Sequence, residues 1–325
     1  MSNCIQSERM IDLIMLKLRE FVKGEDEEVW LSIRNDAFKE YDDFRPSTME
    51  DMEIWEKDPG FDPVGMFIAE LNGEAVGRVQ AYVDKQREEK KGFIRGLGVV
   101  PKLRKRGIGR KLMGKAIGSL RKRGMETAEC STRDDKLVCK HIFESMGFGL
   151  IRVFSTMRRK LDTILSVGEN EDVAIRVMKE GMKDIELLRW LDDETFSEHF
   201  DFRPSTIEDW KHWFSHPDFD HKGWFLALLE GKPVGYVGTW IDSKFVKFKG
   251  IKRGWIQTIG VLKPYRRKGI GTSLILRGME YLKSKGMTEV ELGVDDSNPT
   301  KAIKLYEKVG FRLIRKDLTY LKKTI

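Results

Sequence analysis

Residues 97–109 read Leu-Gly-Val-Val-Pro-Lys-Leu-Arg-Lys-Arg-Gly-Ile-Gly, and residues 259–271 read Ile-Gly-Val-Leu-Lys-Pro-Tyr-Arg-Arg-Lys-Gly-Ile-Gly. In each stretch a short apolar strand is followed by a proline and then by Arg-x-x-Gly-x-Gly, which opens an amphipathic helix. One such motif can arise by chance in a chain of ordinary glycine content, but two in the same strand-turn-helix context cannot. A glycine turn at a helix N-terminus presents backbone N–H groups to an anion, so both stretches predict a phosphate-binding turn.

The similarity extends over both halves of the chain. The pentapeptide Phe-Arg-Pro-Ser-Thr at residues 44–48 recurs 158 residues later, the turn glycines recur after 162 residues, and Gly147-Phe148 recurs after 163 residues. An offset that drifts so little indicates one duplicated unit with small loop insertions. We therefore predict two domains, residues 1–165 and 170–325, joined by a polar connector around Gly168–Asp172.

The composition is that of a globular protein without a membrane partner. Hydrophobic residues make up 40% of the chain, and no run of 18 apolar residues and no signal-peptide pattern occur, so we expect a cytoplasmic protein. The net charge is +7, but basic and acidic residues are mixed along the whole chain. This mixture indicates a solvated charged surface and argues against a nucleic-acid partner. The three cysteines form no CxxC pair, which argues against a disulfide framework or a zinc site.

The apolar patterns and capping signals predict the same order of elements in both halves. For the second half they predict strands and helices alternating as follows: strand Val173–Val177, helix Asp184–Phe196, a helix ending at Phe214, strands Trp224–Leu229 and Val234–Ile241, strand Trp255–Val261, a helix ending before Gly286, strand Glu289–Val294, helix Thr300–Val309 and two short closing strands. Each unit is thus expected to be an α+β fold, a mixed sheet with helices on both faces.

This order, together with the segment from Asn298 through Tyr306 to Gly310-Phe311, resembles the GNAT (GCN5-related N-acetyltransferase) superfamily of acyl-CoA N-acyltransferases. The resemblance covers almost all of both halves. The tandem layout is similar to that of two-domain members whose C-terminal domain carries out the chemistry. The resemblance implies acetyl-CoA as cosubstrate, a primary amine as acceptor, and no metal.

The resemblance also assigns residues to coenzyme A. In the second unit it implies a pyrophosphate turn, a strand that pairs with the pantetheine arm, and a motif asparagine: Arg266, Lys268, Gly269, Ile270, Gly271 and Thr272 in the turn, Ile259 and Val261 in the strand, and Asn298. The first unit matches with Arg104, Arg106, Gly107, Ile108, Gly109 and Arg110 in the turn and Leu97 and Val99 in the strand. Each assignment has an alternative. The turn glycines could serve only to permit close helix packing, the strand could be an ordinary buried strand, and Asn298 could be an N-cap before Pro299.

Tyr306 is the residue that the resemblance makes catalytic. A phenol beside the thioester sulfur can protonate the departing thiolate when an amine attacks the acetyl group. The alternative is a core aromatic residue on a helix that also carries Leu305 and Val309. The first unit has Phe143 at the equivalent position, which keeps the ring and lacks the proton, so we expect that unit to bind coenzyme A or act as a scaffold.

The residue that takes the proton from the amine is not marked by any spacing. Glu194, Asp242 and Asp295 are candidates near the acceptor loops, which we expect at Asp192–Arg203 and Ser243–Arg253. His212 and His216 have i,i+4 spacing suitable for a metal, but the first unit has no histidines at the equivalent positions, so solvated polar positions are the better interpretation.

The sequence therefore predicts an acetyl-CoA-dependent N-acetyltransferase that works by direct attack of a primary amine, with its chemistry in the C-terminal domain. The acceptor is either a small molecule or a protein N-terminus or lysine. A non-catalytic acyl-CoA-binding or regulatory protein that retains the fold is the alternative.

Overall fold

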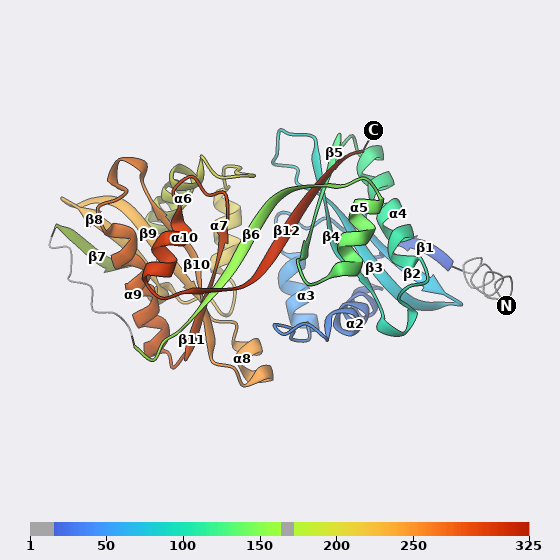
Figure 1. Ribbon diagram of the computed structural model, residues 1–325, viewed down its shortest axis with the longest axis horizontal. Coiled ribbons are helices and arrows are strands. Elements are labelled where there is room, and N and C mark those ends of the chain that lie inside the picture. The colour runs from blue at the N-terminus through green and yellow to red at the C-terminus, as the bar shows by residue number, and fades with distance from the viewer. Residues whose placement is uncertain (1–15, 164–171, 325) are drawn as a thin grey trace. The chain divides into compact units, whose positions relative to one another are not determined.

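The computed structural model describes residues 16–163 and 172–324, and the chain forms two compact units (Figure 1). Of the described residues, the first unit comprises 16–151 and 318–324, and the second comprises 152–163 and 172–317. Each unit has the α+β architecture that the sequence predicts, a mixed sheet covered by helices. The predicted connector lies, apart from Asp172, outside the described residues.

In the second unit the strands lie in the order β6-β11-β10-β9-β8-β7. Neighbouring strands are antiparallel except for β10 and β11, which run parallel. The bounds are β6 (Gly149–Lys160), β7 (Val173–Val177), β8 (Trp224–Leu229), β9 (Lys232–Trp240), β10 (Arg253–Val261) and β11 (Glu289–Asp295). The helices are α6 (Met182–Phe196), α7 (Ile207–Phe214), α8 (Ser243–Lys249), α9 (Ile270–Ser284) and α10 (Ala302–Lys308).

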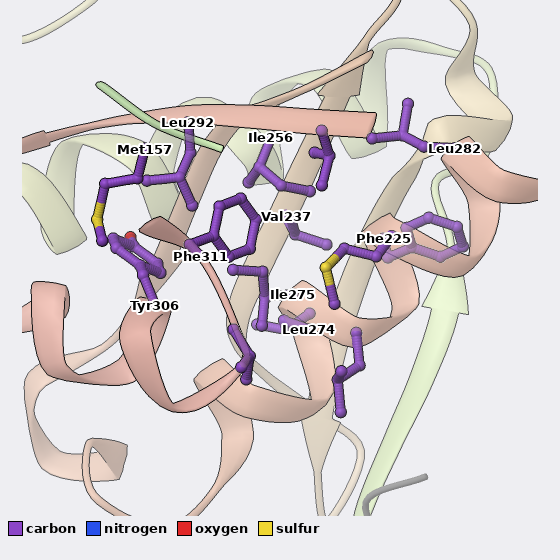
Figure 2. Packing of buried hydrophobic residues seen from close by; sticks show 14 of the residues in the cluster. Met157, Phe225, Val237, Ile256, Leu274, Ile275, Leu282, Leu292, Tyr306 and Phe311 are labelled. Atoms are coloured by element: carbon purple, nitrogen blue, oxygen red, sulfur yellow. The ribbon is translucent and has the colours of Figure 1, made fainter. Parts of the chain in front are cut away.

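The two faces of this sheet bury separate sets of side chains, because successive residues of a strand point to opposite faces. Phe225 and Val237 pack with residues of α9 and α10 in one core cluster, which Figure 2 shows. Trp224, Leu226 and Tyr236, each adjacent in sequence to a residue of the first cluster, pack instead with residues of α6 and α7. Helices therefore cover both faces, as predicted.

Helix α6 lies unusually close to β10 because Gly260 has no side chain. A Cβ atom at Gly260 would lie 2.3 Å from Oγ1 of Thr195 on α6 and 2.8 Å from the Tyr236 ring. This close approach brings the buried face of α6 against the middle of the sheet, where the candidate site lies.

The first unit repeats these elements, with the strands in the order β1-β2-β3-β4-β5-β12. Their bounds are β1 (Leu16–Glu20), β2 (Met66–Leu71), β3 (Glu74–Val83), β4 (Lys91–Val99), β5 (Thr127–Arg133) and β12 (Arg312–Lys323). The helices are α2 (Glu27–Phe38), α3 (Met49–Glu56), α4 (Ile108–Lys122) and α5 (Leu137–Ser145), and single 3₁₀ turns precede β2 and α4.

The compact units and the sequence repeats differ over their last strands. Residues 152–160 of β6 lie at the end of the first repeat but belong to the second unit, where residues 154–160 pair with β11. Residues 318–325, at the end of the second repeat, belong to the first unit, where the Thr324 N–H donates to the Glu126 carbonyl at 2.9 Å. The prediction of two short closing strands was wrong, because β12 is a single strand over Arg312–Lys323. Periodicity within one repeat does not reveal which sheet a closing strand joins.

We expect Tyr320→Ala to lower the free energy of unfolding of the first unit by about 3–5 kcal/mol, the usual range for truncating a buried aromatic side chain. Tyr320 is 2% exposed, its ring centroid lies 5.7 Å from that of Phe143, and its hydroxyl donates to Glu144 at 3.2 Å. Hydrogen exchange should show lost protection in β5 and α5. Tyr320→Phe, which removes only the hydrogen bond, is the control. Lost protection confined to α9 and β10 would contradict the assignment of this strand to the first unit.

Candidate functional site

A cavity of about 1190 Å³ opens in the second unit where β10 and β11 move apart. These parallel strands pair over Arg253–Trp255 and Glu289–Glu291, and the described residues show no pairing between them beyond Trp255. On its other edge, β10 shifts register against β9 between Ile256 and Thr258, which is the signature of a β-bulge. The rest of β10 therefore presents an unpaired backbone edge to the cavity, and such an edge can pair with an extended ligand.

Most of the coenzyme A residues predicted for the second unit line this cavity. The lining includes Ile259, Val261, Arg266, Gly269, Gly271, Thr272, Asn298 and Tyr306. Ile270 instead is 1% exposed and packs in the core cluster. Lys268 lies outside the lining, with its ammonium group 5.6 Å from the centroid of the Tyr265 ring.

The glycine turn has the backbone geometry of an anion site. Arg267 and Gly269 have φ values of 67° and 82°, and the turn runs directly into the N-terminus of α9. The first N–H groups of a helix have no intrahelical carbonyl partner, and alternating backbone conformations of this kind form a concave nest of N–H donors. This geometry places Arg267 in a left-handed conformation, which a non-glycine residue rarely adopts.

Arg266, the first residue of Arg-x-x-Gly-x-Gly, holds the turn in place. Its guanidinium donates to the carbonyl of Val261 at 2.9 Å and to that of Thr195 at 3.2 Å, and it pairs with Glu198 at 3.2 Å. In the first unit Arg104 makes the corresponding bonds to the carbonyls of Val99 and Ala37, and pairs with Glu40. The motif arginine thus ties strand, turn and helix together in both units.

Tyr306 lies on α10 with its ring in the core cluster, beside Phe311 and Met157 (Figure 2). The side chain is 6% exposed and still contributes to the cavity wall. Burial raises the pKa of its phenol to about 12, so the group keeps its proton throughout the neutral range. Tyr306 is therefore both a core aromatic residue and part of the cavity wall.

Asn298 shapes the chain just before α10. Its side-chain oxygen accepts hydrogen bonds from the N–H and the hydroxyl of Thr300, at 2.8 and 2.6 Å. Helix α10 begins at Ala302, two residues later than the predicted start at Thr300, because Lys301 precedes it with a φ of 54°.

The carboxylates predicted as proton acceptors lie in different surroundings. Glu194 is exposed and does not line the cavity. Asp242 caps α8, accepting from the Phe245 N–H at 2.7 Å. Asp295 lines the cavity, but its carboxylate pairs with the Arg152 guanidinium at 2.7 Å.

A fourth carboxylate, that of Asp192 on α6, lies at the cavity and is marked by no sequence motif. Asp192 lines the cavity and accepts a hydrogen bond from the hydroxyl of Tyr236, which lies 2.9 Å from the Thr258 hydroxyl on the bulge of β10. Burial raises the pKa of the Asp192 carboxyl to about 6, against the opposing effect of the Tyr236 hydrogen bond. A carboxylate on the same helix face as Leu188, Leu191 and Thr195 was the available sequence signal.

The first unit keeps the turn and loses the carboxylate. Lys105 and Gly107 have φ values of 63° and 81°, Ile108 is buried in α4, and Arg110 donates to the Ser145 hydroxyl at 2.6 Å. Phe143 is 3% exposed, 163 residues before Tyr306. The positions 158 residues before Asp192 and Tyr236 hold arginines, Arg34 and Arg78.

Arg78 is 8% exposed, its guanidinium lies 4.3 Å from the Trp30 ring centroid, and it donates to the Trp30 carbonyl at 3.2 Å. Burial and the charge of Arg34 lower the pKa of Arg78 to about 9. The centre of the first unit is therefore cationic where that of the second is acidic.

The described residues contain neither a metal-binding cluster nor a membrane-spanning helix. No group of three or more His, Cys, Asp and Glu side chains is arranged to hold a metal ion in the described part of the chain. No described helix is both long and apolar enough to cross a membrane.

The comparisons with known proteins agree with this geometry. The model of the acetyltransferase (GNAT) family matches residues 30–148 and 185–311. Among curated relatives, the mycothiol acetyltransferase of Thermobispora bispora is 31% identical over 225 residues, covering 69% of this chain and 74% of that protein. The mycothiol acetyltransferase of Actinosynnema mirum is 25% identical and covers 81% and 85%.

Two solved structures share the fold over nearly the whole chain. A GCN5-related N-acetyltransferase from Sphaerobacter thermophilus has a TM-score of 0.73 at 22% identity, covering 95% of this chain and 96% of that one. A tandem GNAT protein from the clavulanic acid biosynthesis pathway has a TM-score of 0.72 at 16% identity, covering 95% and 99%. With the family model matching both halves, the chain belongs to the GNAT acetyltransferase family, as an N-acetyltransferase with two tandem GNAT domains whose layout resembles that of mycothiol synthase.

Proposed function

We propose that the second unit transfers the acetyl group of acetyl-CoA to a primary amine by direct attack on the thioester. The observation that carries this proposal is the cavity between β10 and β11, which combines an unpaired strand edge, an anion-binding turn and a buried phenol. The family's use of acetyl-CoA suits this combination, because a pyrophosphate needs the N–H groups of the turn and a pantetheine arm needs an extended edge to pair with.

In this proposal the chain binds and orients acetyl-CoA through backbone groups. Gly269 and Gly271 leave room for the pyrophosphate at the start of α9, and Ile259 and Val261 supply backbone bonds to the pantetheine arm. Arg266 acts as the clamp that fixes the turn relative to β10, since its guanidinium is already bonded to two carbonyls and a carboxylate.

Tyr306 is proposed to protonate the departing thiolate. A phenol with a pKa near 12 is a weak acid for a thiolate whose ordinary pKa is about 8.5. The same apolar surroundings destabilise the thiolate anion and raise the pKa of the thiol too, which narrows the difference between the pKa values of the phenol and the thiol. The useful property of the high pKa is that the resting phenol is protonated at neutral pH. After the phenol donates its proton, the phenolate regains one before the next turnover.

The first unit is proposed to bind coenzyme A or brace the fold without turnover. Phe143 has no proton to give, and the buried Arg78 beside Arg34 stands where an incoming ammonium group would have to approach. Two cations in this position repel a third. The retained turn, with Lys105 and Gly107 at positive φ, supports binding of an anion there.

Tyr306→Phe should lower kcat by about 10²–10⁴-fold, the usual contribution of general acid catalysis. The ring and its packing remain, so the affinity for acetyl-CoA and the melting temperature should stay unchanged. The loss should be uniform from pH 6 to 9, because the phenol is protonated throughout. CoA release with pooled amines, followed by mass spectrometry, measures it. Phe143→Tyr is the matched variant in the first unit, and full turnover by Tyr306→Phe would return this residue to a purely structural role.

Gly271→Val should abolish acetyl-CoA binding to the second unit. A Cβ atom at Gly271 meets Leu305 at 3.4 Å, an ordinary contact, so the fold accepts it while the added methyl groups fill the cavity. Gly109→Val is equivalent, with a Cβ contact of 3.4 Å to Ile142. Titration calorimetry on both variants assigns each binding event to a unit. Turnover that disappears with Gly109→Val and survives Gly271→Val would place the chemistry in the first unit instead.

A further inference from the structure

A second, smaller cavity of about 270 Å³ adjoins the first in the second unit. The two cavities share Asp192, Gln257 and Thr258, so they meet at the bulge of β10. The smaller one is otherwise walled by Asp209 and by three indole rings, those of Trp210, Trp213 and Trp224. Its volume falls just below the range of about 300–1,000 Å³ typical of drug-sized ligands, so it suits a small head group.

Two hydrogen-bond donors in this wall have nothing to bond. The indole Nε1 atoms of Trp213 and Trp224 are buried and have no partner among the described residues, and Trp224 is 2% exposed overall. The third indole is satisfied, because Trp210 donates to the Ser205 hydroxyl at 2.8 Å. A buried donor without an acceptor is unfavourable, so a small side-chain movement that brings these N–H groups to a ligand oxygen would be stabilising.

The two carboxylates of this cavity differ in how many hydrogen-bond donors they already have. Asp209 belongs to the capping box of α7 and accepts from the Thr206 N–H and from the Arg203 guanidinium, both at 2.9 Å. Asp192 has only the Tyr236 hydroxyl as a donor among the described residues. Asp192 is therefore the carboxylate that can pair with an incoming cation at the junction of the two cavities.

Resting on the proposed function, we propose that this aromatic cavity is the acceptor subsite, and that it takes a compact primary amine bearing a hydroxyl or carbonyl oxygen. The oxygen accepts from the two unpaired indole N–H groups, and the ammonium group lies at Asp192. Asp192 takes one proton from the ammonium group: an N–H bond breaks, a carboxyl O–H bond forms, and the freed lone pair forms a C–N bond to the acetyl carbon in the larger cavity. The C–S bond then breaks, the departing thiolate takes the proton of Tyr306, and the nitrogen gives up its second proton, which restores the phenol.

Of this arrangement the first unit keeps one indole and the capping-box carboxylate, Asp51, which corresponds to Asp209. The positions 158 residues earlier hold Met52 for Trp210, Met66 for Trp224, Trp55 for Trp213, and Arg34 for Asp192. The register is secure, because Asn35 bonds Ser47 in the first unit just as Asp193 bonds Ser205 in the second. The shared fold therefore does not require these residues in the second unit.

Other charged groups near Asp192 are accounted for by partners or by position. Asp193 pairs with Arg189 at 3.1 Å and accepts from Ser205, and Asp209 pairs with Arg203. His199 lines the larger cavity, and its imidazole pKa is lowered by burial and by Arg266. Tyr236 donates to Asp192 and its phenol pKa is raised well above its usual value by burial, so it stays protonated.

The first test is direct binding of ethanolamine, with n-propylamine as the probe that lacks the oxygen. In ¹⁵N-labelled protein, ethanolamine should move the indole N–H resonances of Trp213 and Trp224, which Trp213→Phe and Trp224→Phe assign. The Trp210 resonance should move less, because its donor is already bonded. Equal shifts with n-propylamine, or none with ethanolamine while acetyl-CoA binds, would overturn the acceptor subsite and leave the proposed function standing. Loss of acetyl-CoA binding itself would instead refute the proposed function.

The second test is kinetic. Asp192→Asn keeps an oxygen for the Tyr236 hydroxyl and should reduce kcat/KM for ethanolamine about 10²-fold or more. In the wild type, activity should fall as the pH drops through about 6, because Asp192 must be ionised to accept the proton. This acidic limb should vanish in the variant. Its melting temperature at pH 8 should not fall, since removing a buried charge removes a desolvation cost. Glu194→Gln, an exposed carboxylate on the same helix, should leave activity unchanged. An equal acidic limb in Asp192→Asn would overturn the role of this residue.

Discussion

The site depends on the point at which β11 leaves β10. Two parallel strands that pair over a short stretch and then diverge leave an edge of β10 whose backbone donors and acceptors are paired with no strand among the described residues. This cost is concentrated beside the glycine turn, where the start of α9 leaves further donors without partners. Three neighbouring features then keep β10 and β11 apart at this point. The bulge in β10 bends the strand, the Arg266 clamp fixes the turn, and α10 closes the far wall with Tyr306.

The same scaffold carries opposite electrostatics in the two units. Both have the arginine clamp, the positive-φ residues before the helix and an aromatic residue five positions before a buried phenylalanine. The parts that the duplication has kept are those that fix backbone geometry, whereas the side chains that face the reacting groups differ. Asp192 and Tyr236 in one unit correspond to Arg34 and Arg78 in the other, which inverts the charge at the centre without altering the sheet.

Much of this framework could be predicted because it is local. The repeat, the turn glycines and the capping-box helices follow from short-range patterns that the chain states twice. Asp192 could not be identified, since its role comes from meeting Tyr236 and Thr258 across forty or more residues of chain and from burial that only packing creates. The bonds of Arg266 to Thr195 and Glu198 could not be predicted for the same reason, because they join residues about seventy positions apart.

The exchange of closing strands has a consequence for the order in which the protein is made. The first unit includes residues 318–324, which follow the whole second unit in the sequence, so a ribosome that has finished the first repeat has not yet synthesised the first unit's last strand. During most of translation the edge of β5 has no native neighbour, and an open edge can pair with the wrong strand or with another nascent chain. The sheet of the first unit therefore cannot be completed until the second unit has been synthesised. On a polysome that carries several copies, pairing of β5 with another molecule's strand competes with pairing within one molecule.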